Sequence, residues 1–215
     1  MKPERRFSPN AEVRVTRAAD DTQRIEGYAA VFFDESDPGT EFKLFDDFVE
    51  RIMPGAFDGV LSRPDDVRGL FNHDPNQVLG RTASGTMTLS VDAKGLRYSI
   101  EPGDTTVAAD TVSHIERGDV TGSSFAFIPT DVSFRETAGV TIREIRSVDL
   151  FDAGPVTFPA YPASTTGVRS DDYAAIKAEA EQWRADNAAA EFVATNERRK
   201  RNVNQRADMV KRGLA

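Results

Sequence analysis

The chain has 215 residues, enough for one domain of ordinary size and an extension. Hydrophobic residues make up 39% and charged residues 29%, a balance typical of a soluble globular protein. The absence of cysteine excludes disulfides, thiol catalysis and thiolate metal sites. The formal net charge of −8 argues against general nucleic-acid binding, which depends on neutralising phosphates.

The hydropathy pattern argues against a membrane partner. No run approaches the roughly 20 apolar residues that span a bilayer. The first six residues include basic side chains, but no apolar run follows them, so they do not resemble a secretory signal. The 14 phenylalanines against one tryptophan predict a core rich in phenylalanine. We therefore expect neither nucleic acid nor a membrane as a partner.

The first part of the chain, to about residue 165, has the pattern of strands. Apolar and polar residues alternate over residues 12–17 and 24–32, which is typical of half-buried strands. Residues 42–45 and 48–49 continue this pattern. The sequence Pro54-Gly55-Ala56-Phe57 then predicts a short helical turn, because proline is tolerated where a helix begins.

A hairpin and a helix follow. Residues 87–91 and 96–100 flank a short loop, in which we expect Gly95 to take a positive φ. A stripe of apolar residues at helical spacing then predicts a helix, with Asp104 as its N-cap and Gly118 at its end. Strands resume at residues 124–128, 132–135 and 141–151.

The composition changes near residues 166–170, where we place a domain boundary. Residues 171 to about 193 are rich in alanine and contain no glycine or proline, which predicts a helix with a narrow apolar face. The basic cluster Arg198-Arg199-Lys200-Arg201 follows within a polar terminus, and most such clusters are solvated patches. The sequence thus predicts a domain over residues 1–168 and a helical, partly flexible basic tail over 169–215.

Two short segments carry the residues best suited to chemistry. His73, one of only two histidines, ends the apolar run Leu70-Phe71-Asn72, and Ser124 lies within the apolar segment 122–127. A nucleophilic serine needs a nearby base, which at neutral pH is usually histidine. The alternative for His73 is a solvated histidine at the end of a strand. Ser123 competes with Ser124, and the two would point to opposite faces of a strand.

A serine–histidine pair also needs an acid that orients the imidazole. Asp74 is adjacent to His73, but successive residues of a strand point apart, so it is a poor candidate. Asp152 lies among apolar residues, where a carboxylate needs a reason. The alternative for Asp152 is an aspartate that ends the strand 141–151 and begins a turn before Gly154-Pro155.

Other classes of site have little support. His114 falls on the flank of the predicted helix stripe, which indicates a surface histidine. A metal site is disfavoured because the chain has no cysteine ligands and no HExxH-type pair. There is no glycine-rich phosphate loop and no GxSxG nucleophile elbow. We expect no metal and no other cofactor.

Six blocks together resemble the prohead proteases of tailed bacteriophages, the capsid-maturation serine proteases that work with capsid proteins of the HK97-like fold. The resemblance covers about residues 12–165. It includes Pro54-Gly55-Ala56-Phe57, the histidine block around His73 and the serine block around Ser124. In chain order, the blocks are residues 27–32, 52–57, 70–80, 95–96, 118–127 and 152–162.

The resemblance implies an α+β fold, mainly β, with a herpesvirus-assemblin-like barrel surrounded by helices. It implies a serine endopeptidase in which Ser124 is the nucleophile, His73 the general base and Asp152 the orienting acid. Such enzymes cut scaffold segments from the major capsid protein, and then themselves, inside the assembling prohead in the host cytoplasm. The major capsid protein and scaffold would be the partners, and a homodimer is a family-level alternative. The tail would tether the enzyme to scaffold and later be cut.

Two positions depart from the family pattern. The family usually has glycine where this chain has Ala126, and often glutamate where it has Asp152. Aspartate is one methylene shorter, so its reach to His73 is the weakest part of the assignment. These departures leave two alternatives: a catalytically inactive capsid-assembly module of the same fold, and a hydrolase of another substrate class.

Overall fold

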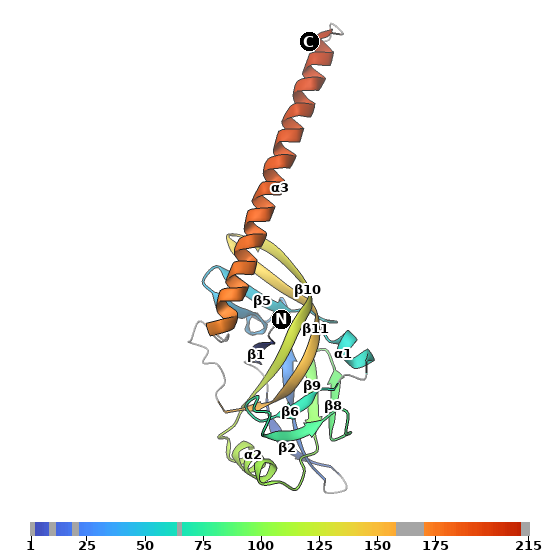
Figure 1. Cartoon of the computed structure of the whole chain (residues 1–215), viewed down its shortest axis with the longest axis vertical. Helices are drawn as coiled ribbons and strands as arrows, with labels where there is room; N and C mark the ends of the chain where they lie inside the picture. The colour runs from blue at the N-terminus through green and yellow to red at the C-terminus, as the bar shows by residue number, and fades with distance from the viewer. Residues whose placement is uncertain (1–2, 9–11, 19–21, 64–65, 158–169, 212–215) are drawn as a thin grey trace. The chain divides into compact units, whose positions relative to one another are not determined.

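The computed structural model describes the chain except for residues 1–2, 9–11, 19–21, 64–65, 158–169 and 212–215 (Figure 1). The chain divides into two compact units, Met1–Ser170 and Asp171–Ala215. Among the described residues, no helix has the length and apolar character needed to cross a membrane. The predicted segment 158–162 of the last family block lies outside the described residues.

The first unit is mainly β. Its largest sheet has the order β1-β10-β11-β5-β4, and β6 pairs with both β11 and β7. These strands are β1 (Glu4–Ser8), β4 (Phe42–Phe45), β5 (Phe48–Ile52), β6 (Arg68–Leu70), β7 (Val78–Arg81), β10 (Gly122–Thr137) and β11 (Val140–Val156). The second sheet has the order β2-β3-β9-β8. Its strands are β2 (Arg14–Arg17), β3 (Gln23–Val31), β8 (Met87–Val91) and β9 (Gly95–Ile100).

The fold class is α+β with a predominance of strands and a C-terminal helix. The remaining elements are η1 (Pro38–Thr40), α1 (Asp58–Ser62), α2 (Thr106–Arg117) and α3 (Ser170–Lys211). The strands form two open sheets rather than one closed sheet, so the barrel expected from the resemblance is not confirmed. The short helix after Pro54 begins at Asp58, because residues 54–57 form turns.

A shared aromatic core lies between the elements. Phe57 meets Phe125 edge-on with ring centroids 5.9 Å apart, and Phe125 stacks on Phe127 at 4.9 Å. All three side chains are fully buried, in agreement with the phenylalanine-rich core that the composition predicts. Offset and edge-on aromatic pairs add to the stability that comes from the burial itself.

The long hairpin of β10 and β11 is the main element of the largest sheet (Figure 1). Its pairing runs from Gly122 opposite Val156 to Thr137 opposite Val140. The sequence predicts three shorter strands here, because polar residues such as Asp131 and Glu136 interrupt the apolar pattern. These residues lie in the second half of β10, where the side chains are exposed or half-buried. The backbone pairing with β11 continues there although the β10 side chains are polar.

Two local predictions were wrong: the positive φ of Gly95 and the N-cap at Asp104. The hairpin at residues 87–100 is present, but Gly95 does not have a positive φ. It is required because a Cβ there would lie 2.0 Å from the carbonyl oxygen of Ala30. Helix α2 has Thr105 as its N-cap, whose side chain accepts from the N–H of Ala108, and not Asp104. Gly118 ends the helix with a φ of 81°, as predicted.

Strand β1 was missed by the sequence analysis, because the side chains that it buries are polar: Glu4, Arg6 and Ser8. Arg6 Nε donates to Glu50 Oε1 at 2.6 Å, and Arg143 Nη1 donates to Glu50 Oε2 at 2.6 Å. Arg143 also donates to both carboxylate oxygens of Glu4, at 2.9 and 3.0 Å. This charge cluster of Glu4, Arg6, Glu50 and Arg143 joins three strands of one sheet, and its formal charges sum to zero.

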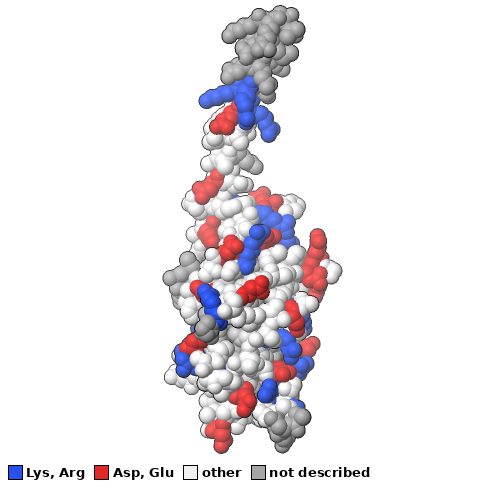
Figure 2. All heavy atoms as spheres, turned by 90° about the vertical axis from the view of Figure 1, so that its right-hand side faces the viewer, with Lys and Arg blue, Asp and Glu red and all other residues white. Residues whose placement is uncertain are grey.

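The second unit is the helix α3, Ser170–Lys211. It extends well beyond the predicted end near residue 193, so that Arg198–Arg201 are helical. Figure 2 shows these Lys and Arg side chains together near the end of the part of α3 that is coloured. On the face of the first unit seen there, acidic and basic residues are interspersed.

The buried charge cluster predicts a large cost for the substitution Glu50→Gln. Burial raises the pKa of Glu50, but the guanidinium groups of Arg6 and Arg143 outweigh this and hold the pKa below its ordinary value. Removing one partner of a buried pair costs about 3–5 kcal/mol, because it leaves uncompensated charge. We expect a loss of this size in the free energy of unfolding at pH 7, measured by urea denaturation.

The same carboxylate predicts how this difference depends on pH. A carboxyl group with a lowered pKa in the folded state contributes its full stability above its ordinary value of 4.5, and loses it as the pH falls through the folded pKa. The gap between wild type and Glu50→Gln should therefore narrow only in acid. The exposed Glu101, paired with Arg24 at 3.8 Å, supplies the control Glu101→Gln. Equal losses from both variants would contradict the prediction.

Candidate active site

The two adjacent serines of β10 have opposite environments. Ser123 faces the core, where its Oγ lies 2.6 Å from the hydroxyl of Tyr98 and is fully buried. Burial raises the pKa of Tyr98 far above its ordinary value, more than the bond with Ser123 lowers it, so the phenol stays neutral. Ser124 faces the other side of the sheet, where its Oγ lies 2.6 Å from His73 Nε2. Of the two serines, only Ser124 has a histidine as its neighbour.

His73 lies in the turn after β6, not within a strand. Asn72 and His73 both have a φ of 56°, a left-handed conformation uncommon for residues other than glycine. Asn72 fixes this turn to the end of β11: its side chain donates to Thr157 Oγ1 at 2.9 Å and accepts from the Thr157 N–H at 2.8 Å. Its own N–H donates to the carbonyl of Pro155 at 3.0 Å. The turn thereby directs the imidazole of His73 over the sheet.

Asp152 contacts the other nitrogen of His73. Its Oδ1 is a hydrogen-bond partner of His73 Nδ1, and the two side chains are only 11% and 8% exposed. The alternative in which Asp152 ends a strand and begins a turn is wrong: the residue lies inside β11, opposite Ala126. Ala126 and Ser124 lie on the same face of β10, so the Asp152 side chain lies on that face too. Its carboxylate therefore reaches His73 without the extra methylene of glutamate. The three predicted site residues therefore meet in one row: Asp152, His73 and Ser124.

The other two candidates have separate local roles. The carboxylate of Asp74 accepts from the N–H and the side-chain amide of Asn76, and these bonds lower its pKa. It therefore caps its own turn, which agrees with its rejection as an orienting acid. His114 is half exposed on α2, 3.4 Å from Asp119, as expected of a surface histidine.

A second contact of Ser124 comes from the strand that the sequence analysis missed. Ser124 Oγ donates to the carbonyl oxygen of Arg6 at 2.9 Å. In the sheet, Phe7 of β1 is the direct partner of Ser124. The sequence of β1 has no alternation of apolar and polar residues, so hydropathy gave no signal that this strand lies beside Ser124.

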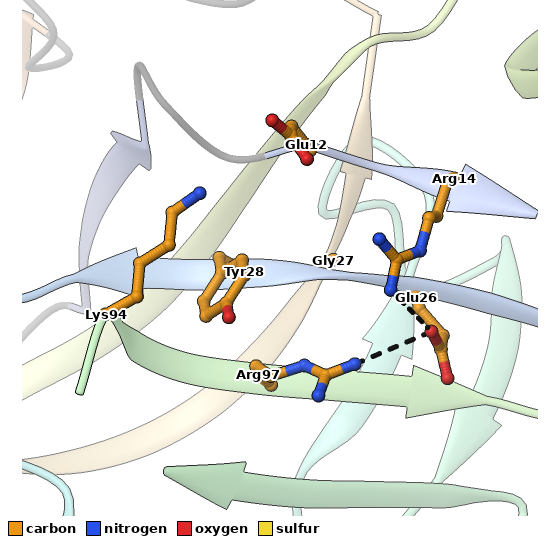
Figure 3. Close-up of a pocket in the computed structure, with 7 residues that line it drawn as sticks. All are labelled: Glu12, Arg14, Glu26, Gly27, Tyr28, Lys94 and Arg97. Carbon is orange, nitrogen blue, oxygen red and sulfur yellow. Dashed lines mark hydrogen bonds and ion pairs between the residues drawn. The ribbon is translucent and has the colours of Figure 1, made fainter. Parts of the chain in front are cut away.

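A separate pocket of about 230 Å³ lies on the second sheet, between β2, β3 and β9 (Figure 3). Glu26, one of its lining residues, pairs with both Arg14 and Arg97, at 3.3 and 3.5 Å. Lys94 Nζ lies 4.6 Å from the centre of the Tyr28 ring. The pocket is thus a mixture of acidic and basic groups that pair with one another, and the row of Asp152, His73 and Ser124 does not line it. Among the described residues, no cluster of three or more His, Asp and Glu side chains is arranged to hold a metal ion.

Gly154 predicts how the site depends on the approach of two strands. A Cβ at this position would lie 2.2 Å from the carbonyl oxygen of Leu70, so Gly154→Ala must push β6 and the turn of His73 away from β11. We expect a loss of about 1–3 kcal/mol, the usual cost of overpacking. Chemical denaturation measures it. In the control Gly59→Ala the new Cβ meets only Arg63 at 3.9 Å, and a drop in stability as large as that of Gly154→Ala would refute the argument.

The comparison with protein families gives one match. A family model described as caudovirus prohead serine protease matches residues 10–179, which include all three residues of the row. No curated protein and no solved structure matches the chain. The match covers most of the first unit and the beginning of α3, and it begins after β1.

Proposed function

The chain belongs to the caudovirus prohead serine protease family, and from this premise we propose that it is the endopeptidase that cleaves the capsid protein and its scaffold segments during prohead maturation. The family places the action of such a protein within the assembling prohead, in the host cytoplasm, with capsid proteins as substrates. The single observation that carries the proposal for this chain is the position of His73, whose two ring nitrogens contact Ser124 Oγ and Asp152.

The proposed mechanism assigns one role to each side chain. Asp152 accepts from His73 Nδ1 and so leaves Nε2 free to act as the base. His73 takes the proton from Ser124 Oγ as the oxygen attacks the scissile carbonyl carbon, and the collapse of the intermediate leaves an acyl group on the serine. The imidazole then gives its proton to the departing amine. Water, deprotonated by His73, hydrolyses the acyl-enzyme and restores the serine.

The shielding of the row supports this assignment. His73 and Asp152 are mostly buried, which strengthens the electrostatic stabilisation of the imidazolium that forms in the reaction. The aspartate is already in contact with the imidazole, so its shorter side chain gives no reason to favour the catalytically inactive module. That module and a hydrolase of another substrate class are the alternatives which the following experiment separates from a protease.

The variant Ser124→Ala tests the nucleophile. Wild type and variant are each co-expressed with the major capsid protein of the same phage, and the masses of all chains are measured by intact-mass spectrometry. We expect the capsid protein to be shortened by wild type only, because removal of the nucleophile from such a triad costs about 10⁶ in rate. The same samples report whether the protease cuts itself.

The control is Ser123→Ala, which removes the same atom one residue away. It leaves the Tyr98 hydroxyl without its partner, at a cost of about 1–3 kcal/mol, so its folding is checked by circular dichroism. Processing by this variant should persist. Shortening of the capsid protein by Ser124→Ala would refute the assignment of Ser124 as the nucleophile. A folded wild type that cleaves nothing would favour the inactive assembly module. Cleavage of esters but not of capsid protein would indicate another substrate class.

For the second unit we propose a tether to the scaffold. The basic cluster Arg198–Arg201 lies at the end of the part of α3 whose side chains are described. The same helix exposes Phe192 and Val193. A cluster of basic groups on an otherwise polar helix suits contact with an acidic partner. We expect a chain that ends at residue 170 to be left out of proheads, as measured by immunoblot of purified particles. Incorporation at the wild-type level would argue against a tether.

A further inference from the structure

Strand β1 lies along the edge of β10 that β11 leaves open. Its register places Arg6 opposite Phe125 and Phe7 opposite Ser124. The peptide bond between residues 6 and 7 therefore lies beside the proposed nucleophile, with the Arg6 carbonyl oxygen 2.9 Å from Ser124 Oγ. An extended substrate in this position would present a backbone carbonyl group to Ser124.

The contact with Arg6 also competes with the proposed base. A serine hydroxyl has a single hydrogen to donate. The carbonyl of Arg6 can only accept, so its bond with Ser124 uses this hydrogen. The transfer to His73 Nε2, 2.6 Å away on the other side, requires the same hydrogen. With β1 in place, the nucleophile thus shares its proton with a group that takes no part in catalysis.

We propose that the edge of β10 beside Ser124 is the substrate-binding edge, which takes an extended peptide as an added antiparallel strand, and that β1 is a resident strand which occupies this edge. The inference rests on the proposed function. In strand addition, main-chain hydrogen bonds provide affinity, and alternate side chains provide specificity. The resident strand β1, which leaves, and the substrate peptide, which replaces it, would then have the same extended backbone geometry.

The side chains of β1 define the chemistry of the substrate. Every second residue points inward, and of these Glu4 and Arg6 meet Arg143 and Glu50. Arg6 places its Nε 2.6 Å from Glu50, and its side chain is fully buried. The edge is therefore suited to a peptide with an acidic residue two positions before an arginine, because both charges then find opposite charges that are already buried.

The charge cluster also permits β1 to leave. When Glu4 and Arg6 depart together, Glu50 and Arg143 remain bonded to one another at 2.6 Å, and their formal charges still sum to zero. No buried charge loses its last partner, which is the situation that makes the breaking of buried pairs so costly.

The experiment measures the accessibility of Ser124 in the full chain. The double variant Glu4→Ala/Arg6→Ala removes the two charges that β1 contributes to the buried cluster and leaves the remaining pair of Glu50 and Arg143 neutral. We expect the rate of labelling by a fluorophosphonate probe, followed by intact mass, to rise at least about tenfold, because the accessible fraction of the site increases. A synthetic peptide of residues 1–9 should reverse the increase, and the same peptide with Arg6→Ala should not.

Three controls make the outcomes distinct. Arg63→Ala removes an arginine from an exposed pair with Asp149, and its labelling should equal that of wild type. Ser124→Ala should not be labelled. Added peptide should also slow the labelling of wild type, which tests the edge even if the double variant does not fold.

Labelling that depends on Ser124 but falls or stays constant in the folded double variant would overturn the inference, because β1 would then be a fixed support of Ser124. The proposed function would survive that result. If no variant is labelled at Ser124, the proposed function fails. Fluorescence polarisation with a labelled peptide of residues 1–9 then decides about the edge: saturable binding, weakened by Arg6→Ala in the peptide, supports it, and no binding overturns it.

Discussion

The rest of the site depends on the close approach of two backbones, at Leu70 and Gly154. A side chain at residue 154 would meet the carbonyl oxygen of Leu70, so the pairing of β6 with β11 requires glycine there. The turn that follows β6 is thereby held over the end of β11, where Asn72 is bonded to Thr157. The imidazole of His73 is directed by these main-chain constraints more than by its own contacts.

The long antiparallel pairing of β10 with β11 provides the other half of the geometry. It places Ala126 opposite Asp152, and the two-residue period of a strand then puts Ser124 on the same face. The same period turns Ser123 into the core, where it bonds with Tyr98. Two adjacent serines thus have different surroundings, because only Ser124 has a histidine within reach.

The charge cluster of Glu4, Arg6, Glu50 and Arg143 gives the sheet an unusual edge. Strand β1 pairs with β10 through its backbone, and it is also held by buried ions that are balanced in pairs. In some proteins such buried clusters specify one arrangement of partners while adding little to stability. The side chains of Glu4 and Arg6 lie on the face of the sheet opposite the Ser124 side chain, while the Arg6 carbonyl accepts from Ser124 Oγ, so the strand that fills the edge and the site are physically linked.

The sequence by itself determined the local features: the strands around residues 24–31 and 87–100, the helix that ends at Gly118, and the residue types of the row. Periodicity and turn residues carry that information, because it depends on neighbours along the chain. Tertiary structure decided what separated segments do to one another. It brought Ser124, and not Ser123, within hydrogen-bond reach of His73, placed Asp152 inside a strand and within reach of the same imidazole, and explained Gly95 by the backbone of Ala30. It alone also revealed β1, since buried arginine and glutamate look like surface residues until their partners, more than 40 residues away, are brought beside them.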